Sequence, residues 1–445
     1  KFQDGTVKCI EDEIPFELPE GWEWCRFTSV TVNRDSERKP ISSANRTNVA
    51  KIYDYYGASG KIDKIDKFIF NEKLLLIGED GANLVTRSKP IAFFAEGQYW
   101  VNNHAHCIDS TDKLILEYLC LYINAISLEK YVTGSAQPKM TQDNMNSILI
   151  ALPPYEEQKR LEFQVNHILK TVSTIENEKE DIVNYIISAK SKILDLAIRG
   201  KLVPQDSNDE PASVLLERIR AEKEELIKQG KIKRDKKESI IFKGEDNSYY
   251  EKVGVEIRCI DSEIPFEIPD GWMYERLGNI CSIARGGSPR PIENYLTDDE
   301  NGLNWIKIGD TEQGGKYIYS TKEKIRPEGL SKTRYVCSGD FLLTNSMSFG
   351  RPYILRTNGC IHDGWLVIGG IEIAFHQDYL YYMLSSSIMY NALSSLAVGS
   401  TVKNLKSDSV KSLLVPIPPL AEQACISRQI ENYFATMLPI ERSLS

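Results

Sequence analysis

Residues 152 to 155 read Leu-Pro-Pro-Tyr and differ at one position from a motif of methyl transfer. Enzymes that methylate the exocyclic amino groups of bases carry Asn or Asp, then Pro-Pro, then Tyr or Phe. The first side chain of that motif accepts a hydrogen bond from the target amine, and the aromatic ring stacks on a base flipped out of the duplex. Residues 152–155 are therefore either an altered catalytic loop or a turn without chemistry.

A second copy of the stretch, Ile-Pro-Pro-Leu at residues 417–420, decides between these alternatives. Leu152 and Ile417 occupy the first position, and neither side chain can accept a hydrogen bond. Glu157 and Glu422 follow the prolines, and acidic residues in a first helical turn complement the positive end of the helix dipole. Proline in that turn loses no hydrogen bond. Both copies therefore predict a strand-to-helix junction, and no Gly-rich loop after a strand indicates an S-adenosylmethionine pocket.

These junctions belong to a tandem repeat. The matching frames are EIPFELPEGW (13–22) with EIPFEIPDGW (263–272), and residues 134–158 with residues 399–423. The interiors between the frames, roughly residues 30–133 and 280–398, share little sequence. Both are rich in strand formers, Gly and Asn/Asp turns, which predicts irregular β-rich lobes.

A long amphipathic pattern follows the first junction. Apolar residues recur at alternating steps of four and three from Leu161 to Leu196, with Lys179 as the exception, and Gly200 follows. This pattern predicts a coiled-coil helix over residues 155–198, about 65 Å long at 1.5 Å per residue. A second helix is predicted over residues 212–229. Because a long exposed seam is unstable alone, the helix that starts at residue 420 is the expected antiparallel partner.

Composition limits the possible functions. The formal net charge is −9, which argues against bulk electrostatic coating of nucleic acid but allows local basic patches. No apolar run reaches the length of a membrane span. The nine cysteines are scattered, which predicts reduced thiols in a cytoplasmic protein.

The residues most similar to a metal cluster are His104, His106 and Cys107. Alternation along a strand would put both histidines on one strand face. Polar or DNA-facing roles are favoured for them over metal binding.

Two lobes on a helical rod could read a two-fold symmetric partner such as double-stranded DNA, or they could hold proteins apart as a scaffold. The residues themselves leave both alternatives open. The two EIPFE frames, the two Pro-Pro junctions and the segment ILDLAIRGKLVPQDSNDEPASVLLERIRAEKEELI (193–227) together resemble the specificity subunit of Type I restriction-modification systems. The resemblance covers essentially the whole chain.

The resemblance implies an α+β fold: two target recognition domains, each a twisted, mainly β lobe with small helices, separated by long antiparallel coiled-coil helices in a pseudo-two-fold tandem repeat. It assigns residues 1–152 to the first target recognition domain, 153–238 to a central helical spacer, 239–417 to the second domain and 418–445 to a shortened C-terminal helix. Each lobe would read one half of a split DNA target, and the helices would set the gap.

The resemblance also implies that the chain is not catalytic and binds no cofactor. Two modification subunits would supply S-adenosylmethionine and the methyltransferase motif, and restriction subunits would translocate and cut DNA. Two departures from the family are apparent. Lys1 begins after the point where relatives carry a helical segment, and Pro439 interrupts the pattern of the terminal helix.

Candidate DNA contacts follow from residue chemistry, because Lys and Arg suit phosphates, Arg also reads guanine, and Asn and Gln suit adenine. In the first lobe they are Ser59, Lys61, Asn83, Arg87, Lys89, Asn102, Asn103 and His104, with Gln137 and Lys139 in the frame. In the second lobe they are Arg285, Arg290, Lys322, Lys324, Arg326, Lys332, Arg334, Ser348 and Arg351, with Lys403 and Asn404 in the frame. The alternative for each residue is a surface turn.

Overall fold

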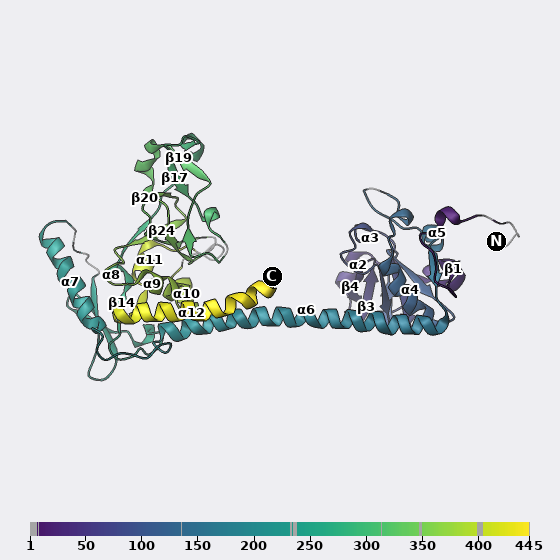
Figure 1. Cartoon of the computed structure of the whole chain (residues 1–445), viewed down its shortest axis with the longest axis horizontal. Coiled ribbons are helices and arrows are strands. Elements are labelled where there is room, and N and C mark those ends of the chain that lie inside the picture. Colours follow the sequence, from purple (N-terminus) through teal and green to yellow (C-terminus); the bar gives the residue numbers. More distant parts are fainter. Residues whose placement is uncertain are drawn as a thin grey trace. The chain divides into compact units, whose positions relative to one another are not determined.

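The computed structural model describes residues 7, 9–134, 136–231, 234, 238–312, 314–346, 349–397 and 404–444. It divides into two compact units, Lys1–Asn177 and Glu178–Ser445 (Figure 1). None of the described helices combines the length and apolar character needed to cross a membrane.

The first unit contains two four-stranded sheets and a short two-stranded sheet. One four-stranded sheet has the order β2-β9-β6-β7 and the other β4-β3-β8-β5, and β1 pairs with β10. Apolar residues of β6, which is buried along its whole length, contribute to two hydrophobic clusters. The strands are β1 (Glu23–Arg26), β2 (Val32–Asn33), β3 (Tyr53–Gly57), β4 (Gly60–Ile65), β5 (Phe70–Asn71), β6 (Leu74–Gly78), β7 (Ala92–Ala95), β8 (Gln98–Val101), β9 (Ala105–Asp109) and β10 (Leu149–Leu152). The helices that begin in this unit are α1 (Phe27–Val30), α2 (Ser43–Thr47), α3 (Asn83–Thr86), α4 (Lys113–Ala125), α5 (Gln142–Asn146) and α6 (Tyr155–Ile198).

The second unit contains two five-stranded sheets, a two-stranded sheet and a three-stranded sheet. The five-stranded sheets have the orders β15-β24-β21-β22-β18 and β16-β19-β17-β23-β20; β14 pairs with β25, and β12 lies between β11 and β13. The strands are β11 (Ser239–Lys243), β12 (Tyr249–Val253), β13 (Glu256–Cys259), β14 (Met273–Arg276), β15 (Ser282–Arg285), β16 (Leu296–Thr297), β17 (Leu303–Ile306), β18 (Tyr317–Ile318), β19 (Glu323–Ile325), β20 (Arg334–Val336), β21 (Phe341–Thr344), β22 (Pro352–Leu355), β23 (Gly359–Ile361), β24 (Trp365–Gly369) and β25 (Leu414–Ile417). The helices are α7 (Ala212–Lys228), α8 (Leu277–Ile280), α9 (Gln377–Ser385), α10 (Ser387–Leu396), α11 (Ser407–Lys411) and α12 (Leu420–Leu444).

The two lobes share one strand topology although their interiors share little sequence. The order β2-β9-β6-β7 corresponds to β15-β24-β21-β22, and β4-β3-β8-β5 corresponds to β19-β17-β23-β20. In each lobe the second of these sheets contains one parallel pair, β3 with β8 and β17 with β23. The tandem α+β architecture expected from the sequence is therefore confirmed.

The repeated frames build the same contacts twice. Arg26 donates to Glu13 at 2.6 Å and to the carbonyl of Ser147 at 2.6 Å. The second copy repeats these contacts: Arg276 donates to Glu263 at 2.7 Å and to the carbonyl of Ser412 at 2.9 Å. The ion pair holds each arginine to the frame segment that precedes it, and the hydrogen bond to the serine carbonyl joins the two ends of the lobe.

Both Pro-Pro stretches are strand-to-helix junctions, as predicted. The strand β10 ends at Leu152 and α6 begins at Tyr155, while β25 ends at Ile417 and α12 begins at Leu420. The helix α6 has 44 residues, which confirms the predicted long helix. Gly200 follows it with φ +64°, a left-handed conformation that favours glycine after a helix C-terminus.

Within the second unit, α12 packs antiparallel to the last turns of α6. Ile426 and Ile430 lie in the same core cluster as Leu194, and further along α12 Glu441 pairs with Lys190 at 2.6 Å. Pro439, which interrupts the apolar pattern of the sequence, lies inside α12, and the helix continues to Leu444. Proline lacks one backbone donor, which leaves a carbonyl one turn earlier without its helical partner.

Candidate nucleic-acid interface

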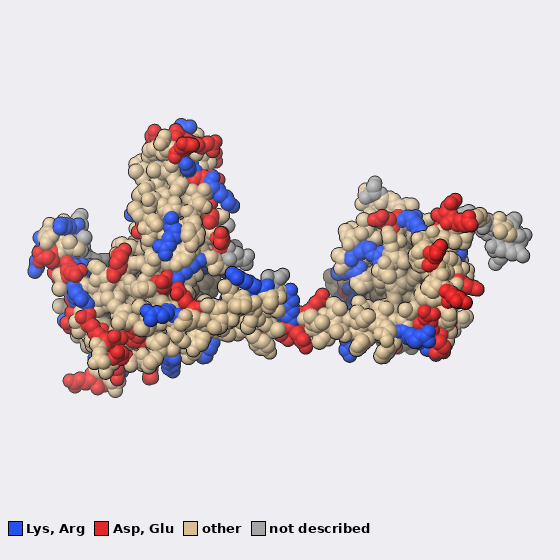
Figure 2. All heavy atoms as spheres, viewed as in Figure 1, with Lys and Arg blue, Asp and Glu red and all other residues tan. Residues whose placement is uncertain are grey.

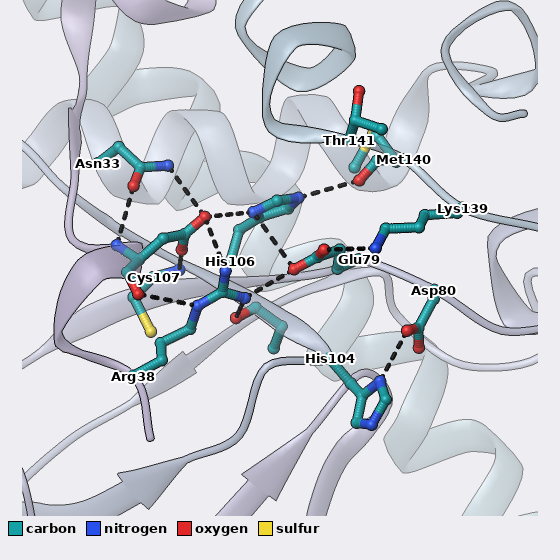
Figure 3. Close-up of polar contacts among 12 residues, drawn as sticks. Asn33, Arg38, Glu79, Asp80, His104, His106, Cys107, Lys139, Met140 and Thr141 are labelled. Atoms are coloured by element: carbon teal, nitrogen blue, oxygen red, sulfur yellow. Dashed lines mark hydrogen bonds and ion pairs between the residues drawn. The ribbon is translucent and has the colours of Figure 1, made fainter. Parts of the chain in front are cut away.

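A buried histidine anchors the polar centre of the first lobe (Figure 3). His106 on β9 is 1% exposed; its Nδ1 lies 2.6 Å from Asp35 Oδ2, and its Nε2 lies 3.0 Å from the carbonyl oxygen of Met140. A carbonyl only accepts, so Nε2 carries a proton. Asp35 also accepts from the backbone N–H of Cys107 at 2.7 Å. These contacts connect the segment after β2 and the frame residue Met140 to β9.

Glu79, directly after β6, joins two cations to this centre. Arg38 donates to Glu79 Oε2 at 2.7 Å, and Lys139 Nζ lies 3.2 Å from Oε1 (Figure 3). Burial alone would raise the pKa values of Asp35 and Glu79. The hydrogen bond and charge of His106 lower the pKa of Asp35, and the hydrogen bond from Arg38 lowers that of Glu79. The network therefore holds both carboxylates ionised and fixes the loops around it.

The turn between β8 and β9 extends from this centre toward solvent. Asn102 is 5% exposed and its Oδ1 accepts from the backbone N–H of His104 at 2.8 Å, so Asn102 shapes the turn. Asn103 and His104 are exposed, and His104 Nδ1 lies 2.6 Å from Asp80 Oδ2. The two histidines do not share a strand face as expected, because β9 begins at Ala105 and His104 belongs to the turn.

The candidate residues in the segment after β6 have different surroundings. Asn83 Oδ1 accepts from the backbone N–H of Lys89 at 2.9 Å and so closes the loop on itself. Arg87, with φ +50°, donates to the carbonyls of Asn124 at 2.5 Å and Ile126 at 2.7 Å at the end of α4. Lys89 is exposed. Of these three residues, Lys89 presents its side chain to solvent for a ligand.

The remaining candidates of the first lobe lie at its surface. Ser59 is half-buried in the turn between β3 and β4, and Lys61 pairs with Asp54 at 2.6 Å. Gln137 is exposed in the frame segment that precedes the Lys139–Glu79 pair.

In the second lobe, three segments distant in the sequence bring basic residues together. Arg285 Nε donates to the carbonyl of Asp363 at 2.9 Å, and Arg334 Nε donates to the carbonyl of Arg285 at 3.1 Å. Arg290 Nη2 lies 3.5 Å from Asp363 Oδ2. Lys332, two residues before Arg334, donates to the hydroxyl of Tyr295 at 2.6 Å and lies over its ring. These predicted candidates therefore form one basic cluster, defined here by Arg285, Arg290, Lys332 and Arg334.

The residues that organise this basic cluster were missed by sequence reasoning. Ser288 donates to Asp363 Oδ1 at 2.7 Å, and Asn345, fully buried, donates to the Asp363 carbonyl at 2.7 Å. The hydrogen bond from Ser288 has the largest influence on this carboxyl: it lowers the pKa of Asp363 and keeps the group anionic. Ser288 and Asp363 are 75 positions apart, so no local pattern indicates their contact.

Other candidates of the second lobe lie outside the basic cluster. Lys322 and Arg326 are exposed, and Lys324 donates to the carbonyl of Glu300 at 3.0 Å. Arg351 is exposed, and Asn404 is half-buried at the frame. Ser348 and Lys403 lie outside the described residues. Figure 2 shows acidic side chains gathering at the end of this lobe that carries β17 and β19.

The polar centres of the two lobes occupy equivalent positions. In each lobe, the residue that follows β6 or β21 donates its backbone N–H to the carbonyl of the residue before β9 or β24. Its own carbonyl accepts a hydrogen bond from a backbone N–H of the repeated frame. In the first lobe, the N–H of Glu79 donates to the carbonyl of His104 at 2.9 Å, and the N–H of Met140 donates to the carbonyl of Glu79 at 2.8 Å. In the second lobe, the N–H of Asn345 donates to the carbonyl of Gly364 and the N–H of Leu405 donates to the carbonyl of Asn345, both at 2.9 Å. The equivalent backbone positions thus carry the carboxylate of Glu79 in one lobe and the amide of Asn345 in the other.

Comparison with known proteins gives a consistent result. A family model described as a Type I restriction modification DNA specificity domain matches twice, at residues 19–193 and 269–444. The specificity subunit of the Type I restriction enzyme EcoEI of Escherichia coli is 27% identical and aligns with 98% of this chain and 81% of its own length. That of EcoAI, also from Escherichia coli, is 29% identical over 64% of this chain and 55% of the relative.

A solved chain shares the fold. It comes from work on complex assembly and conformational transition of the type I R-M system, and it superposes with a TM-score of 0.56 at 16% identity over 97% of this chain and 94% of its own. The two matches of the family model correspond to the two frames and the lobes between them.

Proposed function

The chain belongs to the Type I restriction modification DNA specificity family, and from this premise we propose how it reads DNA and with what it assembles. It is a sequence-specific DNA-recognition subunit with two DNA specificity domains. In our proposal the first lobe reads one half of a bipartite target and the second lobe reads the other half. The coiled-coil helices set the gap between the halves.

The observation that carries this proposal is the pair of equivalent centres with different chemistry. Two lobes of one topology would dock on DNA in the same manner, while different side chains at the same backbone positions would select different bases. In the first lobe, the exposed candidates are Lys61, Lys89, Asn103, His104, Gln137 and Lys139. In the second lobe the basic cluster takes this place. Arg87 and Asn102 are assigned to structure, since their polar atoms bind the protein itself.

As a specificity subunit the chain has a non-catalytic role, and we propose that chemistry resides in its partners. Two modification subunits would hold S-adenosylmethionine and the amino-methyltransferase motif, and restriction subunits would cut unmodified DNA. In support of this division, Leu152 and Ile417 occupy the position of the amine-binding Asn or Asp, and Ile417 is fully buried. The complex would act on the genome in the cytoplasm.

The test is to express the chain with its neighbouring modification subunit in a methylation-free host and to map N6-methyladenine across the genome. We expect a split motif that appears only when both chains are present. Methylation by the modification subunit alone would favour the scaffold alternative, and methylation by this chain alone would show a free-standing methyltransferase. Either result would overturn the proposal.

A lobe exchange tests the assignment of the halves. Replacing residues 30–133 with the corresponding interior of another specificity subunit should change one half of the methylated motif and leave the other half and the gap unchanged. A change in both halves would contradict independent reading by the two lobes.

A further inference from the structure

We infer that the second lobe reads a guanine, with Arg285 as the residue that contacts the base and Asn345 as the residue that positions it. The half-site read by this lobe would therefore contain a G·C base pair at the position facing Arg285. This inference rests on the proposed function and specifies the base for one lobe.

The first step is the way in which Arg285 is held. Its Nε donates to the carbonyl of Asp363 at 2.9 Å, and its own carbonyl accepts from Arg334 Nε at 3.1 Å. Both guanidinium groups are thus fixed through Nε, while Arg285 remains exposed. Guanine presents N7 and O6 as two acceptors in the major groove, and the terminal nitrogens of an arginine match them bidentately. Among the described residues, the terminal nitrogens of Arg285 make no hydrogen bond, so both can donate to a base.

The second step is the rigidity of the support. A Cβ on Gly286 would lie 2.2 Å from the carbonyl oxygen of His362, and one on Gly287 would lie 2.7 Å from the carbonyl oxygen of Lys332. The backbone after Arg285 is therefore in direct contact with the two other segments that form the basic cluster. A preorganised arginine loses less side-chain entropy on binding than a mobile one.

The third step is the role of Asn345. Its Nδ2 donates to the same Asp363 carbonyl that accepts from Arg285, at 2.7 Å. Asn345 is fully buried and its Oδ1 has no hydrogen-bond partner among the described residues. Asn345 cannot reach DNA from this position, so it acts through Asp363 and Arg285.

Phosphate binding is the competing role for an exposed arginine. In a phosphate contact, lysine can replace arginine as a point charge, and the contribution is independent of sequence. A guanine contact depends on the N7 and O6 acceptors of that one base. The two roles therefore differ in their response to a change in the DNA rather than in the protein.

The experiment uses the complex of this chain with its modification subunit and duplexes carrying the mapped target. In one series each guanine of the second half-site is replaced by 7-deazaguanine, which lacks the N7 acceptor. We expect one replacement to weaken binding by the wild type about tenfold, within the range for loss of part of a bidentate base contact. Arg285→Ala should weaken binding to the unmodified target and should be insensitive to that replacement, because it removes every donor that could reach N7.

Asn345→Asp removes the amide donor and should reduce the discrimination between guanine and 7-deazaguanine while binding to the first half-site is retained. Arg356→Ala is the matched control, since Arg356 lies in the same lobe, stacked on Tyr317 at 4.5 Å, and should keep full discrimination. Uniform weakening of all duplexes by Arg285→Ala, with no sensitive guanine, would show a phosphate contact and overturn the inference. A complex that binds every sequence equally would instead contradict the proposed function.

Discussion

At the scale of single residues, Arg87 shows how a charged side chain in a variable loop serves the fold. Its guanidinium donates to carbonyls in the last turn of α4, where the helix dipole is negative and the carbonyls lack helical partners. Arg87→Ala should lower the free energy of unfolding by about 1–3 kcal/mol, because it removes charge-assisted hydrogen bonds from partly buried carbonyls. Urea denaturation at pH 7 measures this change.

Lys89→Ala provides the control, since Lys89 is exposed two residues away and its loss should alter stability by less than about 0.5 kcal/mol. Equal stability of the two variants, together with altered base preference of Arg87→Ala, would instead assign Arg87 to DNA reading.

Glu251 on β12 gives a second residue-scale prediction, which concerns pH. Burial alone would raise its pKa, but hydrogen bonds from Arg276 and Arg258 lower it from 4.5 to about 2. Because the folded-state pKa is below the unfolded one, the stabilisation is present above pH 4.5 and is lost as the pH falls toward 2. Lowering the pH from 7 to 3.5 should remove about 1.4 kcal/mol of unfolding free energy through this group.

Glu251→Gln tests the assignment. At pH 7 it should cost about 3–5 kcal/mol, because Arg276 would then lack one of its buried carboxylate partners. The variant should also show a shallower loss of stability between pH 4.5 and 2 in urea titrations. An unchanged pH dependence would mean that other carboxylates account for the acid sensitivity of the second unit.

The residue types of the site could be predicted from the sequence, but their tasks could not. Arginine and asparagine in Gly-rich loops indicate surface contacts, and Arg285 and Arg290 do lie at the surface. Asn102 and Arg87 have the same chemistry, yet they bind backbone groups of the protein. The role of Asp363 could not be predicted, because its partners come from segments joined only by tertiary folding.

At the scale of elements, local patterns predicted the frames, the junctions and the long helix. Pro-Pro followed by acidic residues and an apolar seam are signals within a few turns, so α6 and α12 begin near where they were expected. The equivalence of β6 with β21 and of β9 with β24 depends on long-range pairing between segments with little sequence in common. Such pairing leaves no local signal, which explains why the shared topology of the lobes appears only in the structure.

The seam of α6 is covered unevenly, and this leads to a prediction for the element. Leu194, next to the seam residue Ile193, is 8% exposed in the cluster that contains Ile426 of α12, whereas the seam residue Ile175 is 59% exposed. Leu194→Ala should cost about 2–5 kcal/mol, as expected for a cavity in a packed core. Ile175→Ala should change the stability of the isolated chain by less than about 0.5 kcal/mol. It should weaken the assembly of the chain with modification subunits, because an exposed apolar seam favours a helical partner. Thermal unfolding and pull-down with the modification subunit distinguish the two effects, and an unweakened complex would place the partner elsewhere.

At the scale of the whole molecule, the net charge of −9 is compatible with DNA binding when the basic groups are local. In the proposed function, the basic cluster of the second lobe and the exposed groups of the first would provide two contact surfaces on a chain that is acidic overall. Two selective surfaces joined by helices make recognition bipartite, so affinity depends on both halves being at the right separation.

If the helices set the gap, the length of α6 determines the number of base pairs between the two halves of the target. Inserting four helix-forming residues after Asn177 would lengthen the helix by about 6 Å, close to the rise of two base pairs, and would turn the following residues by about 40° beyond a full rotation. We expect the methylated motif to keep both halves and to gain about two base pairs in its gap. An insertion of two residues is the matched control, because it turns the following residues by about 200° and should abolish recognition. Mapping the methylation of both variants tests whether α6 sets the gap. Retention of the original gap by the four-residue variant would show that the helix does not set the spacing. Activity of the two-residue variant would show that the helix acts as a flexible tether.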